Sequence, residues 1–114
     1  MGTFISRNTD FPRKTAAFDV AAGTNTIVAA VAGKRIRVLA IILTADISGT
    51  VKFITESPVG DISGTFSVSA TGGFVLNENP SGWFETQADN KALQVETATI
   101  TSLDGLVIYQ EVEA

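Results

Sequence analysis

The apolar and polar positions of this chain alternate with a period of two over much of its length. In residues 50–56, Val51 and Phe53 fall on one face of an extended strand, while Lys52 and Glu56 fall on the other. Residues 65–70 and 92–101 alternate in the same way, and the spacing of an amphipathic helix is missing. The pattern therefore predicts strands that each turn one face toward a common core.

One stretch breaks the alternation and is expected to organise the rest. Residues 34–45 read KRIRVLAIILTA, and the second half is an unbroken run of apolar, mostly branched residues. Strict alternation places on one face Ile36, Val38, Ala40 and Ile42, and on the other Leu39, Ile41 and Leu43. Since a strand that is apolar on both faces is usually covered on both sides, we expect this strand at the centre of a sandwich or barrel.

Turn residues divide the chain about every ten positions. Gly, Asn, Asp and Pro cluster between the apolar segments, as in residues 77–82 and 102–105. The strands expected between them are residues 16–21, 26–31, 34–45, 50–56, 65–70, 74–76, 83–86, 92–101 and 106–113. The first two should form a hairpin through the turn at residues 22–25. The predicted fold is all-β: a single antiparallel β-sandwich, jelly-roll-like, with eight or nine strands.

Residues 1–14 precede the first strand and are predicted to form an extended N-terminal arm on a β-sandwich domain of residues 15–114. The arm is polar apart from Phe4, Ile5 and Phe11, and Pro12 disfavours a helix. It has two interpretations, a disordered tail or a tether whose apolar residues anchor in a neighbouring subunit. Arg13 and Lys14 would add contacts in the second case.

Charge is distributed unevenly between the arm and the domain. Residues 1–14 hold three basic and one acidic side chain, whereas residues 15–114 hold five basic and eleven acidic ones. The net charges are therefore +2 and −6, within a total of −4. A domain this acidic repels nucleic acid and anionic membranes, so neither is expected as a partner.

The residue types needed for most catalytic chemistry are missing. The chain has no cysteine and no histidine, which removes thiolate and triad catalysis and the commonest metal ligands. No phosphate-binding glycine loop or dinucleotide fingerprint is present. Carboxylates such as Glu56 and Glu85 stand at strand ends or on polar faces, and the aspartates lie in separate turns, where they usually accept backbone N–H bonds. We expect no enzyme activity, no cofactor and no metal.

Trp83 and Phe84 are adjacent, so in a strand they point to opposite faces. One ring would fill the core while the other lies outside, where it could seal a subunit interface or stack on a sugar. Burial of both rings under loops is the alternative.

Several motifs resemble a family of small phage and prophage proteins. They are AVAGKRIRVLAIILTA in residues 30–45, TVKF in residues 50–53, GGFV in residues 72–75, NPSGWFET in residues 79–86, ALQV in residues 92–95 and the final GLVIY. The resemblance covers about three quarters of the chain, from Thr26 onward, and does not include the arm.

The resemblance implies a virion structural protein with no catalytic residues, similar to the jelly-roll decoration or cement proteins of tailed-phage heads. Such proteins form homotrimers that bind the major capsid protein on the outer capsid surface, after synthesis in the bacterial host cytoplasm. Phe4, Ile5, Phe11, Arg13 and Lys14 are then expected to make capsid or subunit contacts, and Trp83 and Phe84 trimer packing. The alternative is a carbohydrate- or receptor-binding module of a phage fibre, tail or neck, with Trp83 stacking on a ligand beside Asn77, Asn79 and Glu85.

Overall fold

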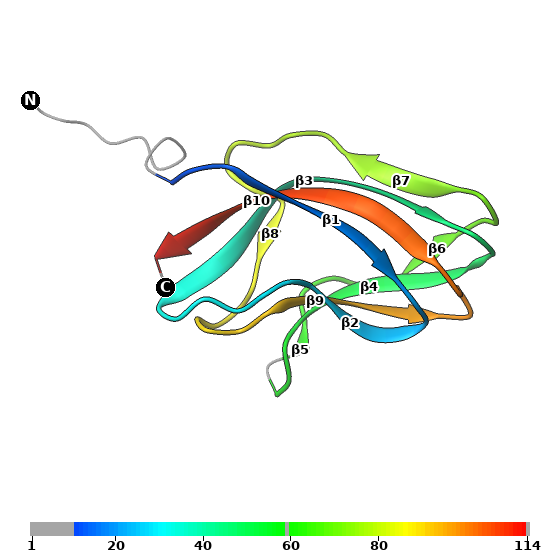
Figure 1. Cartoon of the computed structure of the whole chain (residues 1–114), viewed down its shortest axis with the longest axis horizontal. Helices are drawn as coiled ribbons and strands as arrows, with labels where there is room; N and C mark the ends of the chain where they lie inside the picture. The colour runs from blue at the N-terminus through cyan, green and yellow to red at the C-terminus, as the bar shows by residue number, and fades with distance from the viewer. Residues whose placement is uncertain (1–10, 59, 114) are drawn as a thin grey trace, which may run out of the picture.

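A computed structural model describes residues 11–58 and 60–113, which form ten strands and no helix (Figure 1). The strands are β1 (Lys14–Val20), β2 (Gly23–Val28), β3 (Lys34–Ala45), β4 (Gly49–Thr55), β5 (Gly60–Asp61), β6 (Phe66–Val68), β7 (Gly73–Leu76), β8 (Phe84–Glu85), β9 (Leu93–Ala98) and β10 (Leu103–Glu113). The described part therefore contains no helix that could span a membrane.

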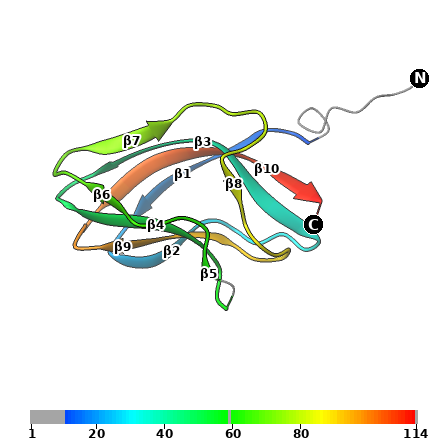
Figure 2. The ribbon, with the colours of Figure 1, turned by 180° about the vertical axis from the view of Figure 1, so that it is seen from behind.

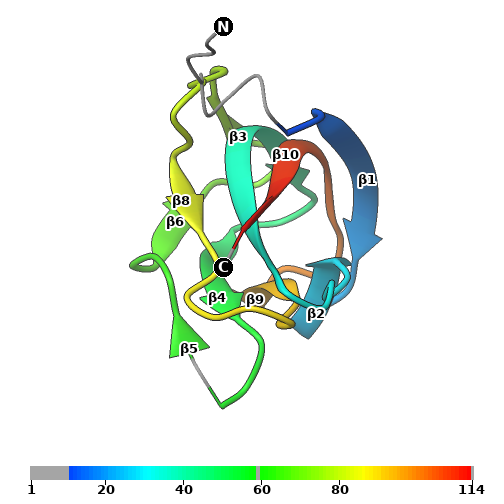
Figure 3. The same ribbon diagram turned by 90° about the vertical axis from the view of Figure 1, so that its left-hand side faces the viewer.

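The strands form two antiparallel sheets that face each other across the core (Figure 3). Sheet A has the order β1-β10-β3-β7, with β8 also paired to β3, and sheet B has the order β2-β9-β4-β5, with β6 also paired to β4. One edge of each sheet is thus shared by two short strands. If β7 and β8 are counted as one interrupted strand, and β5 and β6 as another, the two sheets have the eight-stranded order of a jelly roll. The predicted β-sandwich is confirmed, with β5 as an additional two-residue strand.

The expected hairpin between the first two strands is wrong. β1 pairs with β10 in sheet A, whereas β2 pairs with β9 in sheet B. The turn between them carries the chain from one sheet to the other. Phe18 of β1 and Ile27 of β2 are both buried in the common core, which requires the two strands to approach it from opposite sides.

An aromatic cluster around Phe53 fills one part of the core. Phe53 of β4 is fully buried, as its alternation predicts. Its ring centroid lies 5.2 Å from that of Phe84, 6.4 Å from that of Phe66 and 6.5 Å from that of Phe74. Figure 2 shows the edge strands β6 and β7 at the same end of the sandwich. The ring centroids of Phe66 on β6 and Phe74 on β7 are 5.2 Å apart. These rings connect the two sheets at the split edges.

β3 has the predicted bounds and a central position in sheet A, but its faces do not follow strict alternation. A register shift opposite Ile108 and Tyr109 leaves Leu39 as an extra residue in β3, which is a β-bulge. The bulge changes which residues point inward. Ile36 and Val38 belong to the core before it, and Ile41 and Leu43 after it.

The expectation that both faces of β3 are covered is therefore wrong in its second half. Beyond the bulge, Ala40 and Ile42 lie on the outer face of sheet A, and the side chain of Ile42 is 46% exposed. Residues 11–58 and 60–113 leave this outer face open to solvent.

Candidate functional site

The outer face of sheet A carries a row of exposed apolar side chains across four strands. The strand register places Ala17 of β1 beside Leu106 of β10, Leu106 beside Ile42 of β3, and Ile42 beside Val75 of β7. Leu106, Ile42 and Val75 are 40%, 46% and 56% exposed. A contiguous apolar surface on a small domain is typical of a contact site.

A second row extends this surface toward the bulge. Ile108 and Ala40 are paired two residues along from Leu106 and Ile42, and both are half-buried. Two shallow depressions share Ile42 and Leu106; one continues to Asn77 and Glu78, and the other to Thr44 and Asp104. We define the apolar groove as the surface formed by Ala17, Ala40, Ile42, Val75, Leu106 and Ile108.

On the other side of the bulge, in the first half of β3, the outer face of the same sheet is charged and its charges are paired with one another. The Nζ atom of Lys14 lies 3.1 Å from a carboxylate oxygen of Glu111, and Arg37 donates to Glu85 at 2.9 Å. Arg35 also contacts Glu85, at 3.5 Å. On the outer face, β3 and β10 thus carry charged side chains that form ion pairs at one end, and exposed apolar side chains at the other. Polar residues are clearly compatible with this sheet, so the fold does not explain why the groove is apolar.

The other end of the groove is acidic. Asp19 of β1 lies opposite Asp104 of β10 in the register. The hydrogen bond between these two carboxyl groups raises the pKa of Asp104, with partial burial and the negative charges of Asp19 and Asp46 acting in the same direction. Among the described residues, neither Asp19 nor Asp104 has an ion-pair partner.

Asp46 lies near this acidic end but has a structural role. Its carboxylate accepts hydrogen bonds from the hydroxyl of Thr101, the N–H of Ser102 at 3.0 Å and the N–H of Ile47 at 2.9 Å. These bonds, the one from Thr101 most of all, lower the pKa of Asp46. The predicted turn role is therefore confirmed for Asp46, although the separation of the aspartates in sequence concealed their proximity in the fold.

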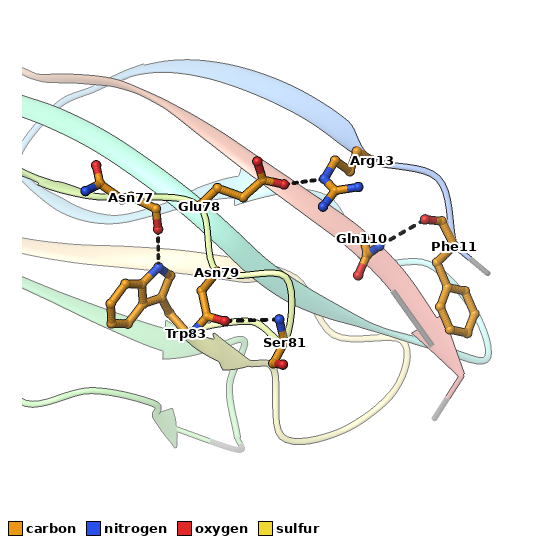
Figure 4. A network of polar contacts seen from close by, with 8 residues as sticks. All are labelled: Phe11, Arg13, Asn77, Glu78, Asn79, Ser81, Trp83 and Gln110. Carbon is orange, nitrogen blue, oxygen red and sulfur yellow. Dashed lines mark hydrogen bonds and ion pairs between the residues drawn. The ribbon is translucent and has the colours of Figure 1, made fainter. Parts of the chain in front are cut away.

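The described part of the predicted arm is bound to the domain (Figure 4). The carbonyl of Phe11 accepts a hydrogen bond from Nε2 of the buried Gln110 at 2.9 Å, and the Phe11 ring lies 5.8 Å from Nζ of Lys34. Arg13 forms an ion pair with Glu78, and Lys14 is the first residue of β1. Phe4 and Ile5 lie outside the described residues, so their contact role stays a prediction.

The two neighbouring aromatic residues point in different directions. The side chain of Trp83 is 46% exposed, and its Nε1 donates to the carbonyl of Asn77 at 2.7 Å (Figure 4). Phe84 packs against Phe53 in the core. Asn79 accepts from the N–H of Ser81 at 3.0 Å, and Glu85 is paired with arginines. Trp83 therefore offers an exposed ring. Of the polar residues expected to bind a sugar beside it, Asn79 and Glu85 have intramolecular side-chain partners, whereas Asn77 contacts Trp83 through its backbone carbonyl.

The carboxylates considered for catalysis also have structural partners. Glu56 accepts the backbone N–H of Ala92 at 2.9 Å, and Glu85 binds Arg35 and Arg37. Within residues 11–58 and 60–113, no group of three or more histidine, cysteine or acidic side chains is arranged to hold a metal ion. The groove and Trp83 remain as the candidate functional surfaces.

The groove is the feature that sequence analysis missed. Its signal was present in the apolar run of β3 and in the similar run LVIY at residues 106–109. The sequence predicts that both faces of residues 34–45 are covered, because the open outer face in one half of this strand depends on the bulge at Leu39. For residues 106–113 it predicts a strand without assigning its faces.

Comparison with known proteins gives a likeness of fold. No family model matches the sequence, and no curated protein matches it. Among solved structures, the chain is similar to a chain of the cyanophage Pam1 capsid asymmetric unit, with a TM-score of 0.57 and 15% sequence identity. The likeness covers 88% of this chain and 85% of that one. The likeness of fold therefore extends over most of both chains.

Proposed function

We propose that this protein is a non-catalytic structural component of a bacteriophage virion, a head decoration or cement protein. It binds the major capsid protein on the outer surface of the shell and braces the lattice. The observation that carries the proposal is the fold shared with a chain of a cyanophage capsid unit over most of both chains.

The surface of the domain supports a task of contact. An open apolar groove and an exposed tryptophan lie on a body in which the carboxylates have structural partners or lie exposed. The chain also lacks the histidine and cysteine on which most nucleophilic and metal chemistry depends. A homotrimer at a local threefold axis would repeat each modest contact three times, so bracing arises from multivalency.

Co-sedimentation with capsids tests the proposal. Capsids of the parent phage, assembled without this protein, are mixed with the purified chain and pelleted. We expect saturable binding and a higher temperature of capsid disruption. The chain has a single tryptophan, Trp83, so its fluorescence reports directly whether that ring becomes buried on the shell. Absence of binding, or equal binding to an unrelated capsid, would contradict the proposal.

The exposed ring of Trp83 favours a second candidate, a carbohydrate- or receptor-binding module of a fibre, tail or neck. Stacking of a sugar on this ring would change the same fluorescence signal. A silent glycan array, together with unchanged tryptophan emission in the presence of saccharides, would dismiss this candidate.

A further inference from the structure

We propose that the apolar groove of one copy binds residues 1–10 of another copy, so that N-terminal arms link neighbouring subunits. Ile5 occupies the groove at Leu106 and Ile42, and Arg7 lies at the carboxylates of Asp19 and Asp104. The inference concerns contacts between copies of this chain and does not depend on the shell as the proposed partner.

The groove has the composition of a surface that is covered in an assembly. Its central row is exposed by 40% to 56% at Leu106, Ile42 and Val75. The charged half of the same strands shows that polar residues are compatible with this outer face. Burial of the row removes apolar surface from water, which favours association.

Charge complementarity identifies the occupant. Asp19 and Asp104 end the groove as two adjacent carboxylates without an ion-pair partner in the described part of the chain. Residues 1–10, MGTFISRNTD, combine apolar side chains at Met1, Phe4 and Ile5 with the cation of Arg7. A guanidinium beside two carboxylates relieves their repulsion and forms strong charged hydrogen bonds.

The spacing of the two sets of residues also agrees. Ile5 and Arg7 are two residues apart, so in an extended segment their side chains lie on one face, about 6.7 Å apart. Leu106 and Asp104 are likewise two residues apart on the outer face of β10. An extended segment aligned with β10 therefore places Ile5 over Leu106 when Arg7 lies at Asp104.

The direction of the segment indicates that it comes from another copy. Within one chain, Phe11 is held by Gln110, six positions along β10 from Asp104, or about 20 Å. Arg7 is four residues from Phe11, so its Cα lies within about 14 Å of that point. A chain's own Arg7 could approach Asp104 only if fully extended, and Ile5 would then lie beyond the groove. Only a segment from a neighbouring copy satisfies both contacts.

Disulfide trapping tests this pairing, because the chain has no cysteine of its own. Two full-length variants, I5C with an affinity tag and L106C without one, are mixed under mild oxidation in the absence of capsids. We expect a covalent dimer of one tagged and one untagged chain. The matched control replaces L106C with I47C, since Ile47 is 41% exposed and Leu106 40%. Docking should favour the L106C product by roughly tenfold or more through effective concentration.

The outcomes separate the alternatives. Equal or absent cross-linking with L106C and I47C overturns the proposal, and so does a purely intramolecular disulfide in the double variant I5C/L106C. Since no shell protein is present, these failures leave the capsid proposal to its own co-sedimentation test.

A charge exchange tests the register. Arg7→Glu in the I5C chain should reduce the yield of the covalent dimer, and Asp104→Arg in the L106C chain should restore it. An unchanged yield with Arg7→Glu would overturn the placement of Arg7 at the aspartates.

Discussion

Asp46 shows how one turn residue can hold two distant parts of the chain together. It leads out of β3, yet its carboxylate accepts hydrogen bonds from Thr101 and Ser102, which precede β10. Because these bonds favour the ionised form, the pKa of Asp46 is lowered in the folded state. The stabilisation is present above the ordinary aspartate pKa of 3.8 and is lost as the pH falls through the lower folded value.

We therefore expect Asp46→Ala to lower the melting temperature at neutral pH. The difference from the parent protein should close as the pH falls below 3.8. Thermal unfolding followed by circular dichroism over this pH range measures both effects. A difference that is independent of pH would show that the lost hydrogen bonds do not depend on the charge of Asp46.

Asp104 is expected to behave in the opposite way. Its pKa is raised, first by the hydrogen bond with Asp19 and then by partial burial and neighbouring charges. The folded state therefore carries a penalty at neutral pH, which is relieved as the pH falls through the raised value. In a chain that lacks residues 1–10, and therefore Arg7, Asp104→Asn should raise the melting temperature at neutral pH, with an advantage that shrinks in acid. Asp89→Asn, at an exposed turn, removes the same formal charge and serves as the control.

At the scale of strands, Gly105 shows why pairing partners were hard to predict. It lies opposite Phe18 of β1, more than eighty residues earlier in the chain. A Cβ atom at Gly105 would lie 2.4 Å from the carbonyl oxygen of Ile42 and 2.5 Å from the Phe18 ring. The glycine therefore permits the close approach of three strands, a requirement that its sequence neighbours do not reveal.

Gly105→Ala should destabilise the fold by about 1–3 kcal/mol, the usual cost of overpacking a filled interior. Gly64→Ala is the matched control, because a Cβ there meets no atom within 4 Å and Gly64 does not have a positive φ. Urea denaturation of both variants measures the difference. Equal stability of the two would show that Phe18 moves aside without loss.

Local pattern predicted the elements better than their arrangement. The bounds of β3 and the inward position of Phe53 follow from hydropathy and alternation alone. The separation of β1 from β2 and the bulge at Leu39 depend on contacts with β10 and β9, which are distant in sequence. The groove depends on that bulge, so it could not be predicted from the sequence. An exposed Trp83 beside a core-packed Phe84 was one of the two alternatives that the sequence left open.

At the scale of the whole molecule, the core and the proposed intersubunit contacts are separate. The residues of the buried core cluster run in sequence from Phe18 to Val107. Phe11 and Arg13 attach the start of the described chain to the domain. A deletion that tests the arm should therefore end at residue 10, since residues 11–14 belong to contacts of the domain itself.

Light scattering at several concentrations then distinguishes assembly from folding. We expect the full-length chain to form an oligomer, and both deletion of residues 1–10 and Leu106→Lys to reduce its mass toward the 12.0 kDa of one chain. Ile47→Lys, at a side chain of similar exposure, should leave the oligomer intact. Unfolding midpoints close to that of the parent protein would show that the loss of mass is not a loss of fold. An oligomer that persists without residues 1–10 would instead place the subunit contacts in the β-sandwich and leave the arm available for the shell.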